Sequence, residues 1–254
     1  MFPIKGSVNG LAINFFTKNE LVDQVVRSIA GTQSQVFYYV NLHTLNLAWH
    51  NSKLREVLSR SDNMFCDGFG VWLLAKFQGI HLTRANRVTW PDIIDPILGF
   101  LEKGQNSVFF ILPHSQVLKS LKIVLKDRFP TLRIDGLVLN ELSLNSHDSI
   151  GVIDQIRKFG CDLLFIGFGS PVQELWIDQN MKELNTKIIL PVGACFEFYT
   201  GFRFRAPRFM TDNGLEWLGR LISNPYRMSQ RYIVGIPLAI FRWFLYRYLG
   251  VRPA

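Results

Sequence analysis

Short apolar runs alternate with longer segments of helical periodicity over the first two hundred residues. The runs are aromatic or β-branched and end at Gly, Pro, Asn or Asp, which is typical of buried strands. Strands are expected at 36–41, 62–67, 107–113, 133–139, 162–169 and 187–193. The periodic segments predict helices at 19–30, 52–60, 91–103, 115–129, 146–159 and 171–184. Apolar strands separated by helices predict a mostly parallel sheet covered on both faces, a Rossmann-like α/β fold.

The pattern changes after Gly201. From there the chain mixes arginine with aromatic and aliphatic residues and shows no strand–helix alternation, a composition typical of helices in a membrane interface. Only ten uncharged residues separate Arg231 from Arg242, too few to span a bilayer. We therefore expect a Rossmann-like catalytic domain over 1–201 and a basic, aromatic-rich helical appendage over 202–254. The alternative is an ordinary pair of helices packed on the sheet.

The positive charge is concentrated in this last segment. Residues 203–254 hold nine arginines, no lysine and two acidic residues, so they carry +7 of the total net charge of +8. Such a segment indicates an anionic partner, either nucleic acid, an anionic membrane surface or a phosphorylated substrate. Arginine without lysine favours geometry-dependent anion binding over a merely soluble basic face. Nucleic acid is disfavoured, because the segment is highly aliphatic and contains no known binding module.

Composition and motif searches exclude several classes of protein. A hydrophobic fraction of 48% and a charged fraction of 19% describe a folded chain. Three widely spaced cysteines form neither a disulfide framework nor a zinc motif, and the first twenty residues lack the features of a signal peptide. There is no GxGxxG, no P-loop and no GxSxG motif. The histidines lack metal-ligand spacing and no aspartates are spaced as DxD, so we expect no metal and no cofactor.

Candidate chemistry lies where the strands end, because ligands of open parallel sheets bind outside the carboxyl ends of the strands. The polar or glycine-rich positions there are Asn41, Asp67–Gly68, 167–173, Gly193 and Glu197. Asp67 is followed by Gly-Phe-Gly, where backbone can approach a ligand closely. A partly desolvated carboxylate there is suited to act as a general base, and the alternative is an N-cap of the next helix. The turn 167–173 is a candidate backbone cradle for phosphate or ribose, or else a tight turn without a ligand.

Several of these segments resemble one known family. They read VNLHTLNLAW (40–49), DGFGVWLLAK (67–76), RVTWPDI (87–93), IGFGSPVQELWI (166–177), VGACFEFYTGFRFRAPRFM (192–210) and GLEWLGRLISNPYRMSQRY (214–232). In this order they resemble the WecG/TagA/CpsF glycosyltransferases, glycosyltransferase family 26, over roughly residues 5–235.

The resemblance implies a bacterial, inverting, metal-independent transferase. It would move a hexose, N-acetylhexosamine or uronic acid from a UDP-sugar to a sugar on a polyprenyl diphosphate. The place would be the cytoplasmic face of the inner membrane, with the protein bound peripherally to an anionic surface. The product would feed exopolysaccharide, capsule, teichoic acid or common antigen. A homo-oligomer is compatible with the sequence, which does not define the oligomeric state.

The resemblance also assigns roles to residues. Asp67 is the general base, Asn41 and Gln173 line the catalytic pocket, and Arg87 is the active-site arginine. The appendage arginines that bind the lipid diphosphate correspond to Arg220, Arg227 and Arg231. From their places at and around the strand ends, we expect the donor- and substrate-binding positions to be Tyr39, Gly68, Gly70, Gly167, Gly169, Ser170, Gly193 and Glu197.

Three positions depart from the family pattern. Tyr39 stands where relatives have a small hydroxyl residue, Glu197 replaces an Asp in an FDF-like segment, and Trp90 stands where glycine is common. All three are expected near the sugar pocket, so the donor is left open among N-acetylmannosamine, its uronic acid, glucose and others. Tyr39 and Glu197 also support an alternative function, a catalytically inactive module that binds nucleotide and membrane.

Overall fold

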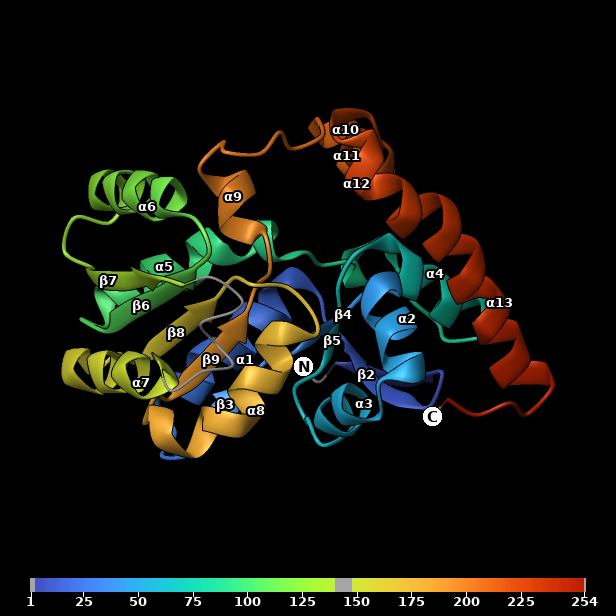
Figure 1. Cartoon of the computed structure of the whole chain (residues 1–254), viewed down its shortest axis with the longest axis horizontal. Helices are drawn as coiled ribbons and strands as arrows, with labels where there is room; N and C mark the ends of the chain where they lie inside the picture. Colours follow the sequence, from blue (N-terminus) through green and yellow to red (C-terminus); the bar gives the residue numbers. More distant parts are fainter. Residues whose placement is uncertain (1–2, 140–147, 254) are drawn as a thin grey trace. The chain divides into compact units, whose positions relative to one another are not determined.

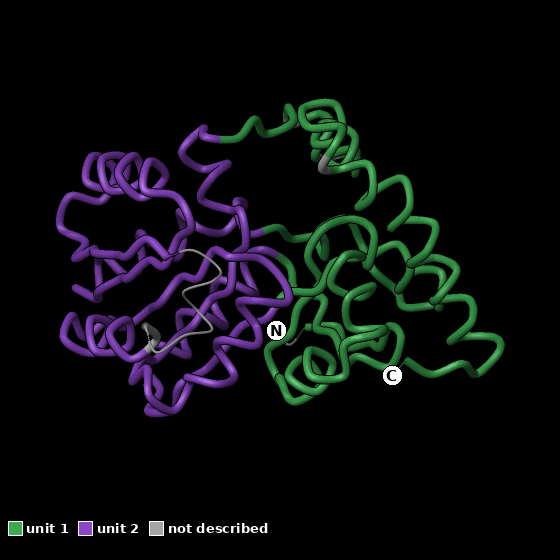
Figure 2. Tube along the Cα trace, viewed as in Figure 1, with its two compact units in different colours: residues 1–17, 39–89, 203–254 green, residues 18–38, 90–202 purple. Residues whose placement is uncertain are grey.

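The computed structural model describes residues 3–139 and 148–253. The chain folds into two compact units that are discontinuous in sequence (Figure 2). Unit 1 comprises residues 1–17, 39–89 and 203–254, and unit 2 comprises 18–38 and 90–202. This division by contacts differs from the consecutive division into 1–201 and 202–254, because the C-terminal segment belongs to the same compact unit as the N-terminal strands.

Unit 2 is built on a five-stranded parallel sheet in the order β3-β9-β8-β6-β7 (Figure 1). Its strands are β3 (Gln35–Val36), β6 (Ser107–Leu112), β7 (Arg133–Val138), β8 (Leu163–Ile166) and β9 (Ile188–Pro191). Its helical elements are α1 (Lys18–Ile29), the 3₁₀ turn Trp90–Asp92, α5 (Ile94–Lys103), α6 (Ser115–Arg128), α7 (Asp148–Phe159), α8 (Val172–Leu184) and α9 (Cys195–Tyr199). Helices α1 and α5 contact each other, and so do α7 and α8.

The core of unit 2 centres on three phenylalanines. Phe110 of β6 and Phe165 of β8 stack with their ring centroids 5.3 Å apart. Phe196 of α9 meets both rings edge-on, at 5.0 Å from each. All three side chains are buried. The cluster therefore fixes α9, and with it the turn that follows β9, to the sheet.

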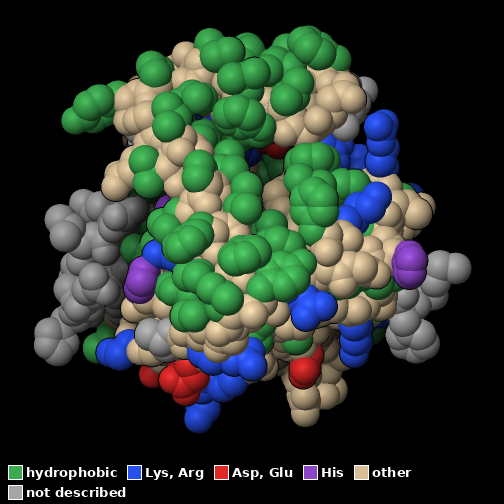
Figure 3. Space-filling model, turned by 90° about the vertical axis from the view of Figure 1, so that its right-hand side faces the viewer, with side chains coloured by type: hydrophobic (Ala, Val, Ile, Leu, Met, Phe, Trp, Pro, Cys, Tyr) green, Lys and Arg blue, Asp and Glu red, His purple; other side chains and the backbone are tan. Residues whose placement is uncertain are grey.

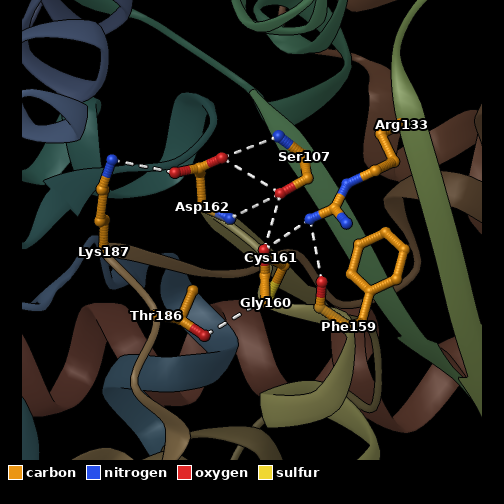
Figure 4. A network of polar contacts seen from close by, with 8 residues as sticks. All are labelled: Ser107, Arg133, Phe159, Gly160, Cys161, Asp162, Thr186 and Lys187. Carbon is orange, nitrogen blue, oxygen red and sulfur yellow. Dashed lines mark hydrogen bonds and ion pairs between the residues drawn. The ribbon is translucent and has the colours of Figure 1, made fainter. Parts of the chain in front are cut away.

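A polar network joins the amino ends of β6, β8 and β9 (Figure 4). Asp162 accepts hydrogen bonds from the backbone N–H of Ser107 at 2.9 Å and from its hydroxyl at 3.1 Å. The other carboxylate oxygen of Asp162 pairs with Lys187 at 2.9 Å. Arg133 donates to the carbonyls of Phe159 and Gly160. These contacts tie the strands together at the edge opposite their carboxyl ends.

Unit 1 contains a four-stranded sheet in the order β1-β2-β5-β4. Its strands are β1 (Ile4–Val8), β2 (Leu11–Phe15), β4 (Tyr39–Val40) and β5 (Phe65–Cys66), and its first helical elements are α2 (Leu42–His50), α3 (Ser52–Ser59), α4 (Phe69–Phe77) and the 3₁₀ turn Arg84–Asn86. Strands β1 and β2 form an antiparallel hairpin, whereas β5 pairs with β2 and β4 in parallel. The hairpin turns at Asn9-Gly10, both with positive φ, as a type I′ turn requires.

The C-terminal segment is helical throughout most of its length. It contains α10 (Arg208–Asp212), α11 (Glu216–Ser223), α12 (Pro225–Ser229), a π-helical turn (Gln230–Val234) and α13 (Gly235–Tyr248). Helix α13 packs on α2, where the buried Arg242 donates to the carbonyl and side-chain oxygens of Asn46 at 3.1 and 3.0 Å and contacts His50. Asn46 in turn donates to the carbonyl of Gly235 at 2.7 Å. Among the described residues no helix combines the length and apolar character needed to cross a membrane.

The α/β fold with mostly parallel strands, flanking helices and a helical C-terminal segment is confirmed. The strands form two sheets where one was expected, because the predicted strand 36–41 divides into β3 and β4, which join different sheets. The predictions missed the β1–β2 hairpin and helix α2. The predicted helix from 146 is seen from Asp148, and 146–147 lie outside the described residues.

We expect Phe196→Ala to lower the free energy of unfolding by about 3–5 kcal/mol, because it removes a buried ring from the three-phenylalanine cluster. Ile123→Ala is the control, since that side chain is 72% exposed and its loss should change stability by less than about 0.5 kcal/mol. Urea denaturation of both variants measures the difference. Equal effects of the two substitutions would contradict the assignment of this core.

Candidate active site

Asp67 lies directly after β5, where two neighbouring parallel strands of unit 1 end. Its backbone N–H donates to the carbonyl of Val40 at the end of β4 (2.9 Å), and Asp67 forms a parallel bridge with Val88. The N–H of Gly68 donates to the Val88 carbonyl at 3.1 Å. Backbone contacts on both sides therefore fix the position from which the carboxylate projects.

Asn41 connects the end of β4 to helix α2. It is the N-cap of α2, with its side-chain oxygen accepting from the Thr44 N–H at 3.1 Å. The amide nitrogen of Asn41 donates to a carboxylate oxygen of Asp67 at 3.4 Å. Because the cap bond orients the amide, its N–H group is directed at Asp67. Asn41 and Asp67, predicted at the ends of separate strands, therefore lie side by side, because β4 and β5 are parallel neighbours.

The C-terminal segment brings charged side chains to Asp67. Glu216 and Arg220, one turn apart on α11, form an ion pair at 2.5 Å. The charges of Glu216, Arg220 and Arg231 all act on the Asp67 carboxylate. Arg231 lies in the π-helical turn, and such turns frequently occur at functional sites. The surroundings of Asp67 therefore combine one further carboxylate with two guanidinium groups.

These surroundings set the protonation of two groups. Burial and the Glu216 carboxylate raise the pKa of Asp67 to about 6, although Arg220, the Asn41 hydrogen bond and Arg231 oppose the rise. Burial and the charge of Arg231 lower the pKa of His43, in the first turn of α2, to about 4. At neutral pH Asp67 is therefore an ionised carboxylate that binds a proton more readily than an ordinary Asp, and His43 is uncharged.

Arg87 also connects this site to the C-terminal segment. Its guanidinium donates a hydrogen bond to the carbonyl of Thr211 in α10. Arg87 immediately precedes Val88, which pairs with Asp67. The backbone of Arg87 therefore lies close to Asp67, and its side chain is directed to helix α10 of the C-terminal segment.

The glycines of the 67–70 motif have two different structural roles. Gly68 has a φ of 81°, a left-handed conformation that side chains disfavour. A Cβ atom at Gly70 would lie 2.4 Å from the Leu42 side chain, so glycine there lets α4 pack against α2. Both glycines are required to build the backbone around Asp67.

Five of the remaining predicted positions belong to unit 2 and lie after the carboxyl ends of β8 and β9. The turn after β8 contains Gly167, Gly169 and Ser170, and the turn after β9 contains Gly193. A Cβ atom at Gly167 would lie 3.0 Å from the Gly193 carbonyl oxygen, so the two turns approach closely. The Gln173 side chain accepts from the N–H groups of Gly169 at 3.0 Å and Gly193 at 3.1 Å.

Four further predicted positions lie outside these turns. Tyr39 in β4 is buried. Trp90, in the 3₁₀ turn Trp90–Asp92, and Glu197, in α9, are buried as well. Arg227 lies in α12, and its side chain is outside the described part of the structure. Within residues 3–139 and 148–253, no group of three or more His, Cys, Asp or Glu side chains could hold a metal ion.

Sequence reasoning missed Glu216 and His43. Glu216 stands four residues before Arg220 on a helix, a spacing that favours an ion pair and could have identified it. His43 carried no usable signal, because helix α2 itself was not predicted. Its relation to Arg231 depends on residues far apart in the sequence.

We expect Glu216→Gln to lower the pKa of Asp67, because the substitution removes the negative charge that helps to raise it. Carbon-13 NMR titration of the Asp67 carboxyl measures the change from a starting value of about 6. Glu56→Gln is the matched control, since Glu56 also pairs with an arginine four residues away, Arg60, but on an exposed face of α3. An unchanged Asp67 pKa in Glu216→Gln would contradict the described electrostatics.

The sequence also matches known proteins over almost its whole length. Residues 7–252 match the family model described as glycosyl transferase WecG/TagA/CpsF family. A Bacillus subtilis (strain 168) protein named N-acetylglucosaminyldiphosphoundecaprenol N-acetyl-beta-D-mannosaminyltransferase is 26% identical over 223 residues, covering 87% of this chain and 81% of the relative. A Staphylococcus aureus (strain MW2) protein of the same name is 21% identical over 240 residues, covering 94% and 91%. The chain belongs to the WecG/TagA/CpsF family of glycosyltransferases.

Proposed function

We propose that this protein is an inverting, metal-independent glycosyltransferase that uses a UDP-sugar and a polyprenyl-diphosphate-linked sugar. The observation that carries the proposal is Asp67, a carboxylate with a raised pKa at the ends of β4 and β5, with Arg220 and Arg231 acting on it. The family match and the names of the relatives support the substrate class.

In the proposed reaction, Asp67 removes the proton of the acceptor hydroxyl. The hydroxyl oxygen then forms a bond to the anomeric carbon of the donor, and the bond from that carbon to the diphosphate breaks, with its electron pair leaving on UDP. Attack opposite the leaving group inverts the anomeric configuration. A base with a pKa of about 6 is ionised at neutral pH yet retains affinity for the proton it receives.

The guanidinium groups have the complementary role. Arg220, Arg227 and Arg231 are proposed to bind the lipid diphosphate, because planar guanidinium groups bind phosphate oxygens bidentately. The ion pair with Glu216 holds Arg220 in place before the anion arrives. The glycine-rich turns after β8 and β9 are proposed to bind the donor, because glycine lets a ligand approach the backbone closely.

We expect Asp67→Asn to lower kcat by about 10²–10⁴-fold, the usual contribution of general acid–base catalysis. The assay follows UDP release with a panel of UDP-sugars, beginning with UDP-N-acetylmannosamine, and an N-acetylglucosaminyl-diphosphate lipid as acceptor. In the unsubstituted protein kcat/KM should fall as the pH decreases below about 6, because the base becomes protonated.

Asp127→Asn, at an exposed position of α6, is the control and should retain full turnover. Near-normal turnover by Asp67→Asn would exclude Asp67 as the base. If the unsubstituted protein bound UDP-sugars but transferred none of them, a catalytically inactive binding module would be the better description.

We further propose that the C-terminal segment binds the cytoplasmic face of the bacterial membrane peripherally. Helix α13 turns Ala239, Arg242 and Trp243 inward, while Ile240, Phe241 and Phe244 are exposed. Figure 3 shows hydrophobic side chains gathered over this side of the protein, with Lys and Arg among and around them. Exposed apolar side chains combined with a net positive charge favour an anionic lipid interface.

Replacing Phe241 and Phe244 together by Ser should weaken binding to phosphatidylglycerol-containing vesicles about tenfold or more, because their exposed apolar surface would no longer enter the lipid. Vesicle co-sedimentation measures the change. The paired control replaces Phe100 and Ile123, exposed apolar residues of unit 2, by Ser and should leave binding unchanged. Equal binding by both double variants and the unsubstituted protein would refute the interfacial role of α13.

A further inference from the structure

The side chain of Gln173 joins the two glycine-containing turns of unit 2. Its oxygen accepts hydrogen bonds from the N–H groups of Gly169, in the turn after β8, and Gly193, in the turn after β9. Its nitrogen donates to Glu174 at 2.9 Å. An amide oxygen accepts two hydrogen bonds, so both acceptor sites of Gln173 are occupied by backbone.

Glu174 completes this arrangement. One of its carboxylate oxygens accepts from Gln173 and from the hydroxyl of Ser170 at 2.7 Å. The buried second oxygen has no hydrogen-bond partner among the described residues. Ser170 belongs to the turn after β8, so Glu174 fixes that turn and also orients the amide of Gln173.

Burial separates these two side chains from any ligand in solution. Gln173 and Glu174 are both 0% exposed, although they lie beside turns at the ligand-binding edge of a parallel sheet. Glycine at 167 allows the turns to approach, and the Gln173 amide sets how far apart their N–H groups lie. This geometry differs from the pocket-lining role that the family resemblance implies for Gln173.

We propose that Gln173 and Glu174 are positioning residues, a buried pair that holds the turns after β8 and β9 at the spacing needed by the donor and that touches no substrate. The part about the donor rests on the proposed function. The spacing itself is a property of the substrate-free protein, which allows the two to be tested apart.

The test compares variants that keep or remove particular hydrogen bonds. Gln173→Met removes the acceptor oxygen and leaves the Gly169 and Gly193 N–H groups without it. Glu174→Gln keeps an oxygen that can accept from Ser170 and Gln173, whereas Glu174→Met does not. Ser107→Ala is the matched control, because Ser107 is equally buried but lies in the network at the opposite ends of the same strands (Figure 4).

Amide hydrogen exchange of the substrate-free protein is the first measurement. Gln173→Met and Glu174→Met should accelerate exchange at Gly169 and Gly193 about tenfold, because these bonds no longer hold the turns closed. Glu174→Gln should remain close to the unsubstituted protein. Ser107→Ala should leave exchange at these two glycines unchanged. Should Gln173→Met fail to fold, the comparison of Glu174→Met with Glu174→Gln decides the exchange test, since only Glu174→Met leaves the Gln173 amide without its acceptor.

Steady-state kinetics with the UDP-sugar that the protein uses is the second measurement. Gln173→Met should raise the donor KM about tenfold, with a smaller effect on kcat, and Ser107→Ala should leave the donor KM unchanged. Loss of kcat with unchanged exchange at both glycines would overturn the proposal and make Gln173 a catalytic residue. Equal damage from Glu174→Gln and Glu174→Met would overturn the role of Glu174. If no UDP-sugar is used, the proposed function fails, and the exchange data alone decide whether the pair sets the spacing.

Discussion

The site in unit 1 depends on the free energy of ionising one partly buried carboxylate, that of Asp67. Parallel pairing of β4 with β5 places Asp67 beside Asn41, and the C-terminal helices add Glu216, Arg220 and Arg231. Burial and Glu216 disfavour the ionised form, while the two arginines and the Asn41 amide favour it. The balance keeps Asp67 charged at neutral pH and raises its affinity for a proton, which are the two properties a general base needs.

Helix α13 buries an arginine against the protein and exposes several aromatic side chains. Arg242 is buried against α2 and hydrogen-bonded, while neighbouring aromatic residues of α13 are exposed. Such a helix is anchored by its polar contacts, because the carbonyl of Asn46 gains a charged donor. Its exposed apolar side chains form the surface that the proposed membrane binding would remove from water.

In unit 2 the two ends of the parallel strands are stabilised by different groups. Charged and hydroxyl side chains join the amino ends of β6, β8 and β9, and glycines with one buried amide shape the carboxyl ends. At the amino ends, hydrogen bonds and an ion pair between side chains hold the strands together. At the carboxyl ends the N–H groups of Gly169 and Gly193 are held by the Gln173 amide, and the donor is proposed to bind beside these turns.

The sequence by itself determined the alternation of strands and helices, the strand-end positions of Asn41 and Asp67, and the basic C-terminal segment, because these follow from local periodicity and composition. It could also have shown the β1–β2 hairpin, through Asn9-Gly10. Only the tertiary structure divided 36–41 between two sheets, buried Arg242 and Gln173, and brought Glu216, Arg220 and Arg231 to Asp67. Burial and charge proximity depend on tertiary contacts such as that of Arg242 with Asn46, 196 positions earlier, and no local pattern encodes them.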